Sequence, residues 1–596
     1  MKSSGLLATL AAGLCASAFS FERRQSSNWT VGQTVQTESG PVSGRAAKNN
    51  TEVSEYLGIP FGQAPVGDLR FAAPVKFTGS ASINGSSYGP NCPVKTSNSS
   101  LPTAQEIDAA NVTAAGFSTF SILSATGEFS EDCLNLNVWT KPQTGDSKKA
   151  VLVWIYGGSF SSGSSSIRAY NGANIAGQED VVVVSFNYRL SILGFPGNPN
   201  STANVALLDQ RLAMEWVRDN IENFGGDPSR ITLFGQSAGG ASVDMYSYAW
   251  TSDPIAAGFI PESGNAIGWG LPNSKEFGAA AWYNVSTTLG CGNASSDSTA
   301  VLECMRKQNY TNILNSIPAA SGTAAILGYF GPTEDDVVVF SNYSSRTPAK
   351  VPMLIGNNNY EAGLFRTQFA LKGIFYPDNF WDAFNLQAFT CPTGIRANLS
   401  VAAGNPTWRY RYMGVFPNLA ISTEAGSYHI AEVPILFNTA PTTPPASEAQ
   451  ISIGNYMRGA WAAFAKDPKE GLTNYGWPVY NTSQDSLVRL GYENITGPNL
   501  INPYRYDADC VFVNVSSTDS TVEIPDIPDL GASVTPTANG TSPTPTPTAS
   551  GTGSGSASGS GSGTTSPSPT STGNAGGKVA ASVYLGMVGV MAAALM

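Results

Sequence analysis

The sequence predicts an α/β fold in which a mostly parallel central sheet is flanked by helices. Residues 150–156 (AVLVWIY) and 181–188 (VVVVSFNY) are nearly continuous runs of apolar and β-branched residues, typical of strands buried on both faces. Residues 205–225 then repeat apolar side chains at helical spacing, and 231–235 (ITLFG) is another short apolar strand. Strand, helix and strand in this order indicate a parallel sheet covered by helices.

The composition of the chain is that of one large globular unit, which we expect over residues 21–520. Hydrophobic residues make up 42% of the 596 residues, enough to bury a large core. Only 13% are charged and the net charge is −11, so the chain lacks the basic footprint of a nucleic-acid or anionic-membrane binder. A small neutral substrate fits this composition better than a polyanion does.

The N-terminus has the features of a secreted protein. Residues 1–20 join one Lys to an apolar run that ends in small residues, which predicts a signal peptide cut near Ala18 or Ser20. Arg23-Arg24 is a second candidate processing site. Dense Asn-x-Ser/Thr sequons after this peptide predict a glycoprotein with N-glycans. The sequon residues are Asn28, Asn49, Asn84, Asn98, Asn111, Asn200, Asn284, Asn293, Asn309, Asn342, Asn398, Asn481, Asn494, Asn514 and Asn539.

The C-terminal part changes in character. Residues 521–574 are rich in Ser, Thr, Pro and Gly and have few apolar residues to bury, which predicts a disordered, O-glycosylated stalk. Residues 575–596 are almost wholly apolar, with no charge after Lys578. A membrane-spanning helix is one interpretation. No basic residues follow, and small residues precede the run, so we favour a GPI-attachment signal that is removed and leaves the protein anchored at the cell surface or cell wall.

Cysteine usage supports an extracellular location. Of seven cysteines, Cys15 leaves with the signal peptide, and the remaining six suggest three disulfides among fifteen possible pairings. No C-x-x-C pair occurs, which argues against zinc or thioredoxin-like chemistry. We therefore predict no metal and no cofactor.

A nucleophile motif follows the strand at 231–235. Gly235-Gln236-Ser237-Ala238-Gly239 is a G-x-S-x-G sequence, and the small-residue run AGGASV follows the serine. This chemistry requires a sharp strand-to-helix turn that presents the serine hydroxyl, with glycines that let neighbouring chain approach closely. The strand before the motif supplies that context, so the sequence predicts Ser237 as a nucleophile.

Acyl transfer through a serine also needs N–H donors for an oxyanion. One donor is expected directly after the nucleophile, at Ala238. The others should lie in a glycine-rich turn after an earlier strand, and WIYGGSF provides Gly158 and Ser159. Alone, this would be an ordinary Gly-Gly turn; beside the serine motif it predicts an oxyanion hole.

These motifs, with others in the same order, resemble the type-B carboxylesterase/lipase family, α/β-hydrolases that include cholinesterases and fungal secreted esterases and lipases. The resemblance covers residues 30–515, with Asn135 where an aromatic or Thr is more usual. The similar segments are 56–71 (YLGIPFGQAPVGDLRF), 131–139 (EDCLNLNVW), 186–195 (FNYRLSILGF), 209–221 (DQRLAMEWVRDNI) and 224–240 (FGGDPSRITLFGQSAGG).

The resemblance implies a Ser-Glu-His triad and supporting residues. The family's acid turn matches IGNNNYEAG, which makes Glu361 the acid, and its histidine motif matches GSYHIAE, which makes His429 the base. His429 is the only histidine in the chain. Ser263 in PESGN matches a serine that supports the acid. The implied disulfide pairs are Cys92 with Cys133, Cys291 with Cys304, and Cys391 with Cys510.

The activity implied by the resemblance is hydrolysis of neutral carboxylic esters through an acyl-enzyme. A lidded triacylglycerol lipase acting on lipid is an alternative, and a non-catalytic cell-surface adhesion protein is another. The loop between Cys92 and Cys133 contains no Trp, and Gln236 replaces the acidic neighbour of the cholinesterase serine, so choline esters are not expected. That loop forms a mobile lid in fungal lipases of the family; a solvated Ω-like surface loop is the other interpretation.

Overall fold

One mixed sheet runs through the described chain. The computed structural model describes residues 29–95, 103–144, 147–199, 201–268, 270–319 and 328–513. Within these residues, eleven strands bond in the order β14-β13-β12-β11-β10-β9-β7-β8-β6-β4-β3. The strands from β8 to β13 in this order are parallel, and antiparallel strands complete both edges. The predicted α/β fold is therefore confirmed.

The strands of this sheet are β3 (Arg45–Ala47), β4 (Asn50–Pro60), β6 (Asn135–Thr140), β7 (Lys149–Ile155), β8 (Val182–Phe186), β9 (Gly226–Gln236), β10 (Gly258–Glu262), β11 (Met353–Asn358), β12 (Thr407–Tyr412), β13 (Leu487–Leu490) and β14 (Asn499–Ile501). A smaller sheet contains β1 (Thr34–Thr37), β2 (Gly40–Ser43) and β5 (Ile83–Asn84).

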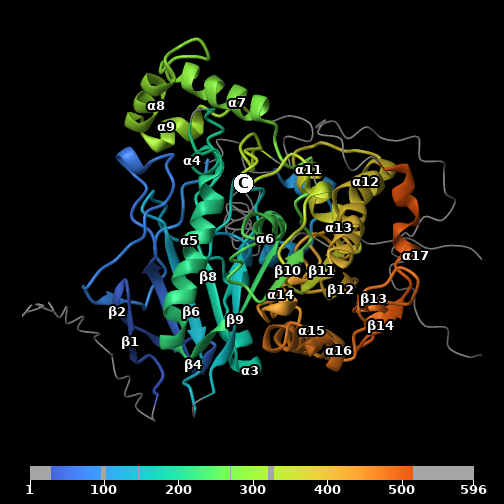
Figure 1. Cartoon of the computed structure of the whole chain (residues 1–596). Helices are drawn as coiled ribbons and strands as arrows, with labels where there is room; N and C mark the ends of the chain where they lie inside the picture. Colours follow the sequence, from blue (N-terminus) through green and yellow to red (C-terminus); the bar gives the residue numbers. More distant parts are fainter. Residues whose placement is uncertain are drawn as a thin grey trace, which may run out of the picture.

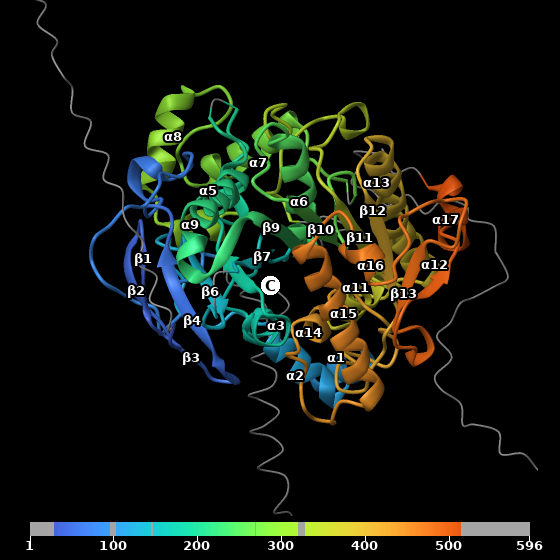
Figure 2. The same ribbon diagram turned by 60° about the horizontal axis from the view of Figure 1, so that its bottom comes forward.

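Helices connect the strands and cover both faces of the sheet. They are α1 (Ala104–Ala109), α2 (Ala114–Ile122), α3 (Ala173–Glu179), α4 (Ser191–Gly194), α5 (Val205–Asn220), α6 (Ala238–Ala249), α7 (Lys275–Thr288), α8 (Ser298–Lys307), α9 (Tyr310–Asn315), α11 (Ala362–Ala370), α12 (Asp378–Asn385), α13 (Cys391–Ala402), α14 (Val433–Leu436), α15 (Glu448–Lys466), α16 (Gly471–Asn474) and α17 (Tyr504–Asp507). Figure 1 shows this arrangement, with α7, α8 and α9 together at one end of the molecule. In Figure 2, α5, α6 and α13 lie on one side of the sheet and α3, α14 and α15 on the other.

Two predicted elements have different ends in the structure. The helix expected over 205–225 stops at Asn220 and continues as one 3₁₀ turn, because Gly225 adopts a left-handed conformation (φ 85°) that closes it. The strand expected at 231–235 begins earlier, at Gly226, because this residue pairs with Lys149 of β7. Cross-strand pairing is a tertiary effect that local sequence does not contain.

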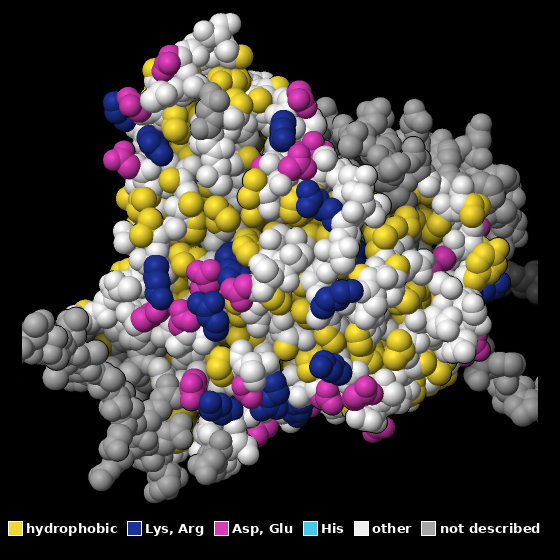
Figure 3. Space-filling view, in the orientation of Figure 1, with side chains coloured by type: hydrophobic (Ala, Val, Ile, Leu, Met, Phe, Trp, Pro, Cys, Tyr) yellow, Lys and Arg dark blue, Asp and Glu magenta, His cyan; other side chains and the backbone are white. Residues whose placement is uncertain are grey.

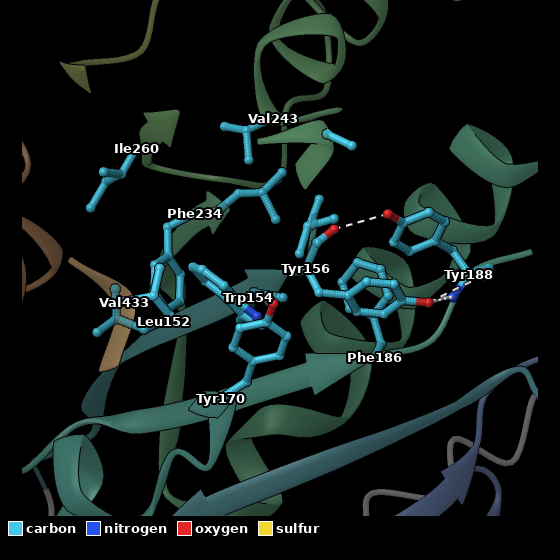
Figure 4. Packing of buried hydrophobic residues seen from close by; sticks show 14 of the residues in the cluster. Leu152, Trp154, Tyr156, Tyr170, Phe186, Tyr188, Phe234, Val243, Ile260 and Val433 are labelled. Carbon is cyan, nitrogen blue, oxygen red and sulfur yellow. Dashed lines mark hydrogen bonds between the residues drawn. The ribbon is translucent and has the colours of Figure 1, made fainter. Parts of the chain in front are cut away.

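Aromatic side chains fill the core next to β7. The ring of Trp154 lies 4.8 Å from that of Phe234 and 5.2 Å from that of Tyr170 (Figure 4). It also lies 5.0 Å from the ring of Phe437, so three elements converge on one residue. Tyr156 stacks on Tyr188 at 4.5 Å, and the Tyr188 hydroxyl donates to the Tyr156 carbonyl oxygen at 2.9 Å. These contacts fix the carboxyl end of β7, where the predicted oxyanion turn begins.

The surface carries charges of both signs. On the face in Figure 3, Lys and Arg side chains lie beside Asp and Glu side chains rather than forming a basic patch. Ion pairs have the same mixed character; Arg211, for example, contacts Asp253 (2.6 Å) and Glu215 (2.8 Å). Such pairs solubilise the surface and contribute little to stability.

The predicted processing segments lie outside the described residues. These are the signal peptide at 1–20, the stalk at 521–574 and the GPI signal at 575–596. Among the helices that the structure describes, none is long and apolar enough to cross a membrane.

A fully buried ion pair joins two helices on one face of the sheet. Arg396 of α13 donates to the Asp244 carboxylate of α6 at 2.6 Å, and neither side chain is exposed. The other Asp244 oxygen accepts the Ala266 N–H at 2.9 Å, in the loop after β10. The pair therefore ties α13 and this loop to the helix that follows Ser237.

We predict that Arg396→Met destabilises the protein by about 3–5 kcal/mol, because it leaves the Asp244 carboxylate buried without its cation. Arg366→Met is the matched control. Arg366 pairs with Asp378 and Glu424 at 2.8 Å but is partly exposed, so its loss should cost less than about 1 kcal/mol. Urea unfolding followed by fluorescence measures both changes. Equal losses in the two variants would contradict the prediction.

Candidate active site

Ser237 occupies a sharp turn between β9 and α6. Its backbone has φ 59° and ψ −124°, a sparsely populated conformation that costs on the order of 1–3 kcal/mol and persists only where its surroundings impose it. The Ser237 N–H donates to the Glu262 carbonyl oxygen, and its own carbonyl oxygen accepts the Ala241 N–H, both at 2.9 Å. Ser237 is half-buried, whereas Gln236 and Ala238 are buried. The turn therefore presents the serine hydroxyl.

Close backbone approach explains the glycines of the motif. A Cβ at Gly239 would collide with the carbonyl oxygen of Ile155, and a Cβ at Gly235 would lie 2.6 Å from the same atom. A Cβ at Gly264 would collide with the carbonyl oxygen of Ser237. Strands β7 and β10 thus hold the turn from both sides, and only glycine leaves room for them.

The glycine-rich turn after β7 lies against Ser237. A Cβ at Gly157 would be 2.7 Å from the Ser237 Cβ, so no side chain fits between the two turns. Gly158 and Ser159 both have positive φ, 115° and 52°. A positive φ is strained for a residue with a Cβ, and Ser159 adopts it although it is not a glycine.

Three backbone N–H groups are available at this junction. In the part of the chain that the structure describes, no group accepts a hydrogen bond from the N–H of Gly158, Ser159 or Ala238. Ala238 is also the first residue of α6, whose N-terminus favours negative charge. The predicted oxyanion donors thus lie in the two turns beside Ser237.

Glu361 and His429 form a buried pair. Glu361 follows β11 and is fully buried, and His429 is 4% exposed. The His429 Nδ1 lies 2.6 Å from Glu361 Oε2, and the His429 backbone N–H donates to the Glu361 carbonyl oxygen at 3.3 Å. A neutral imidazole that donates from Nδ1 carries its lone pair on Nε2.

The second oxygen of Glu361 is held by two donors. Oε1 accepts the Ser263 hydroxyl at 2.7 Å and the Asn358 backbone N–H at 2.5 Å. Donors to a carboxylate stabilise its charged form, which offsets the cost of burying it. Ser263, directly after the neighbouring strand β10, therefore helps to hold the Glu361 carboxylate in place.

Gln236 brings the histidine next to the nucleophile turn. Its Nε2 lies 3.2 Å from His429 Nε2 and 3.4 Å from Nδ1. Because Gln236 directly precedes Ser237, the imidazole lies beside the turn that carries the serine. The sequence pointed to Gln236 only as a substitution relative to cholinesterases; its contact with the ring is a tertiary feature.

Aromatic rings enclose the histidine. Phe365 of α11 and Phe389 lie 5.2 and 5.1 Å from the imidazole, and both belong to a cluster of aromatic side chains from α11, α12 and the π-helical turn Leu386–Thr390. This wall excludes water from one side of the ring and so strengthens its electrostatic contact with Glu361. Sequence analysis missed these two residues, since no local pattern connects them to His429.

Residues 103–132, the longer described part of the segment between Cys92 and Cys133, are docked on the chain that leads to His429. The Thr113 N–H donates to the Ile421 carbonyl oxygen at 3.1 Å, and the Thr423 N–H donates to the Asn111 carbonyl oxygen at 3.3 Å. A Cβ at Gly116 of α2 would lie 2.5 Å from the Ile421 oxygen. Phe120 of α2 is 2% exposed. Backbone bonds and buried apolar surface therefore fix α2 in place.

Three disulfides join the expected cysteines. The structure contains Cys92–Cys133, Cys291–Cys304 and Cys391–Cys510. The last of these links α13 to the C-terminal end of the described chain. Disulfides of this kind are typical of proteins in oxidising compartments. Among the described residues, no group of acidic, Cys and His side chains has the arrangement of a metal site.

Comparison with known proteins identifies the family of the chain. Residues 31–376 match the profile of the Carboxylesterase family. The chain is 33% identical over 510 residues to chlorogenic acid esterase of Aspergillus niger, covering 81% of this chain and 95% of that protein. It is 32% identical over 504 residues to secreted lipase 5 of Gibberella zeae, covering 78% and 91% respectively. The chain belongs to the carboxylesterase family.

Other relatives match over a shorter range. Cholinesterase of Mus musculus is 36% identical over 308 residues, which cover 50% of this chain and 48% of that protein. Membership of the family makes this carboxylesterase a carboxylic-ester hydrolase with an α/β-hydrolase fold.

We predict that Ser263→Ala lowers kcat of this carboxylesterase about 10- to 100-fold with little change in KM, because a hydrogen bond to a charged group contributes about 1.5–3 kcal/mol. Ser185→Ala is the matched control. Ser185 is also a buried serine; it lies in β8, and its hydroxyl oxygen accepts a hydrogen bond from the Asn137 side-chain amide at 3.2 Å. Steady-state kinetics on a soluble acetate ester measures both variants. A loss in the control as large as that in Ser263→Ala would contradict a specific role for Ser263.

Proposed function

We propose that this carboxylesterase hydrolyses neutral carboxylic esters through Ser237 as nucleophile, His429 as base and Glu361 as acid. The observation that carries the proposal is the buried His429–Glu361 contact at 2.6 Å, with Gln236 joining the same imidazole to the Ser237 turn. An imidazole oriented by a carboxylate next to a strained serine is the arrangement that activates a hydroxyl.

In the acylation step, His429 Nε2 takes the Ser237 proton while the serine oxygen attacks the ester carbonyl carbon. Glu361 keeps the imidazole in the tautomer with the proton on Nδ1 and stabilises the imidazolium that forms. The N–H groups of Gly158, Ser159 and Ala238 would receive the developing oxyanion. The imidazolium then gives its proton to the leaving alcohol, and Ser237 keeps the acyl group.

In the second step, water replaces the alcohol. His429 accepts a proton from this water, which attacks the acyl-serine ester, and the same three N–H groups stabilise the second tetrahedral intermediate. Collapse releases the carboxylic acid, and the proton returns to Ser237. No residue beyond the triad and these donors is required to balance the reaction.

Several features support a neutral ester as substrate. The chain has a net charge of −11, and the uncharged side chains of Gln236, Phe365 and Phe389 are among the neighbours of His429. The relatives include a chlorogenic acid esterase and a secreted lipase, which supports carboxylic esters as the substrate class. We infer a general carboxylesterase specificity for soluble esters.

The docked segment between Cys92 and Cys133 favours an esterase over a lidded lipase. Opening a lid here would break the bonds of Thr113 and Thr423 and expose Phe120 and Ile107, which are 2% and 3% exposed. Asn111, a sequon residue on this segment, is exposed. A glycan at Asn111 would hinder docking on an oil surface without blocking small soluble esters. We therefore retain lipase activity only as an alternative outcome of the test below.

An extracellular glycoprotein with a GPI anchor is part of the proposal. Every sequon asparagine in the described ranges is exposed, as attachment of an N-glycan requires. These residues are Asn49, Asn84, Asn111, Asn284, Asn293, Asn309, Asn342, Asn398, Asn481 and Asn494. Release of the cell-bound protein by a phosphatidylinositol-specific phospholipase would test the anchor.

We predict that Ser237→Ala and His429→Ala each lower kcat for p-nitrophenyl acetate by at least about 10³-fold while the protein stays folded. The burst of p-nitrophenol that reports the acyl-enzyme should disappear in Ser237→Ala, because no acyl group can attach. Stopped-flow absorbance measures the burst, and near-UV circular dichroism checks the fold. Full activity in a folded His429→Ala protein would overturn the proposal, since the chain has no other histidine.

We predict that the rate on short-chain triacylglycerols rises smoothly with concentration and shows no jump at the solubility limit, because α2 does not have to move. The measurement is a pH-stat series on triacetin and tributyrin below and above saturation, with and without detergent. An abrupt increase when the emulsion forms would instead support a lidded lipase. Ser237→Ala serves as the blank for both substrates.

A further inference from the structure

Two buried carboxyl groups near the triad have no part in the proposed mechanism. Glu262 is the last residue of β10, and Glu432 lies at the N-terminus of α14, three residues after His429. Both are fully buried. A buried carboxyl group is costly unless it is paired, hydrogen-bonded or neutral, so each needs a physical account.

Glu262 belongs to a row of residues that crosses the sheet. It is the register partner of Gln236 in β9 and of Gly356 in β11, and Gly356 is the partner of Tyr410 in β12. A Cβ at Gly356 would collide with the ring of Tyr410, so this ring lies over the glycine. Residues in one row share a face of the sheet, so Tyr410 leans toward Glu262.

Helix α15 packs against Glu262 and Tyr410 of this row through Trp461. The Trp461 indole N–H donates to Glu262 Oε1 at 2.7 Å, and the Trp461 ring lies 5.1 Å from that of Tyr410. Glu262 Oε2 and the Tyr410 hydroxyl oxygen are buried, and neither atom has a hydrogen-bond partner among the described residues. Glu262 is therefore sealed in a mainly apolar and aromatic environment.

Glu262 is connected to both ends of the triad through its backbone. Its carbonyl oxygen accepts the Ser237 N–H at 2.9 Å. The next residue, Ser263, donates to the Glu361 carboxylate at 2.7 Å. Any change in the charge or position of Glu262 thus acts on the nucleophile turn and on the acid together.

Glu432 is connected through Asn358. The Asn358 side-chain amide donates to Glu432 Oε2 and, at 2.7 Å, to the carbonyl oxygen of Tyr428, which precedes His429. The Asn358 backbone N–H donates to Glu361. One asparagine therefore holds the acid, the second carboxyl group and the histidine loop.

The donors are distributed unequally among the three carboxyl groups. The Glu361 carboxylate accepts from Ser263, Asn358 and His429, whereas among the described residues the Glu262 carboxyl group accepts only from Trp461. Donors stabilise the anion, so the charge belongs on Glu361. Burial raises the pKa of Glu262 to about 8, and burial together with the charge of Glu361 raises the pKa of Glu432 well above its usual range.

No cation neutralises the two additional groups. In the described ranges, neither Glu262 nor Glu432 forms an ion pair with Lys or Arg. Arg458 of α15 donates to the Ile435 carbonyl oxygen at 2.8 Å, and Arg411 of β12 donates to Asn359 at 2.9 Å. The remaining titratable groups that face them are the neutral hydroxyls of Tyr170, Tyr410, Tyr412 and Tyr428.

From this geometry we infer that Glu262 acts as a neutral carboxylic acid and is a positioning residue of the proposed triad. Together with neutral Glu432 it leaves Glu361 as the only anion behind His429. The inference rests on the proposed function only in its kinetic readout; the protonation of Glu262 is a property of the fold. Ionised Glu262 would oppose the oxyanion that forms beside Ser237 and would repel Glu361, so its ionisation should stop turnover.

The experiment compares the alkaline limb of kcat/KM in wild type and Glu262→Gln, on a soluble acetate ester whose alcohol product is quantified by chromatography. Gln keeps the acceptor for Trp461 and cannot ionise. In wild type, kcat/KM should fall about tenfold per pH unit above the Glu262 pKa of about 8. In Glu262→Gln the value at about pH 7 should stay within about threefold of wild type, and the alkaline fall should be absent.

Glu55→Gln is the matched control. Glu55 is also a buried glutamate that accepts from an indole N–H, that of Trp139 at 3.4 Å, but it forms an ion pair with Arg45 at 2.7 Å. Its replacement should leave the alkaline limb unchanged. If Glu262→Gln does not fold, Glu262→Met is the second neutral variant. An alkaline fall in a folded neutral variant equal to that of wild type, or loss of activity at pH 7, overturns the inference.

Thermal stability gives a readout that does not depend on catalysis. Folded Glu262 retains its proton up to a pKa of about 8, whereas unfolded Glu releases it near 4.5. Its contribution to stability is therefore full below pH 4.5 and declines as pH rises toward 8. We expect the Tm of the Ser237→Ala/Glu262→Gln double variant, minus the Tm of Ser237→Ala alone, to increase steadily as the pH rises from about 4.5 to about 8. A pH-independent difference overturns the inference, whatever Ser237 proves to do.

Discussion

The buried carboxylate of Glu361 is the constraint on which the site depends. An anion inside a sheet must find donors for both oxygens, and three strands or loops supply them: Ser263 after β10, Asn358 of β11 and His429 in the loop before α14. Each donor is fixed by its own backbone position. Placing this one charge therefore brings the strand ends and the histidine loop into a single geometry.

Close packing of backbone around Ser237 is the second element of the arrangement. The turns after β7, β9 and β10 approach so closely that Gly157, Gly235, Gly239 and Gly264 have no room for a side chain. The strain of the Ser237 backbone is maintained by its hydrogen bonds to Glu262 and Ala241. Because these contacts exist before substrate arrives, the proposed oxyanion donors of Gly158, Ser159 and Ala238 would need no rearrangement to meet a developing charge.

The surroundings of the site explain which of the buried carboxyl groups is ionised. Phe365 and Phe389 flank the imidazole, and Trp461 and Tyr410 enclose Glu262. In such surroundings only groups with several donors remain ionised. The unequal supply of donors to Glu361, Glu262 and Glu432 thus decides which carboxyl group carries the charge.

Local sequence patterns are enough to identify the fold class, the family and the candidate residues Ser237, Glu361 and His429. Short-range patterns encode these features: buried strands read as β-branched runs, and the nucleophile turn requires glycines at fixed spacing. The single histidine left no ambiguity about the base.

Which distant side chains come into contact depends on how the whole chain folds. The contacts of Gln236 with the imidazole, of Asn358 with Glu361 and Glu432, and of α2 with residues 420–423 join segments separated by many residues along the chain. The early start of β9 at Gly226 has the same origin, since its partner Lys149 lies on another strand. Such pairings follow from sheet register and close packing, which no local sequence pattern records.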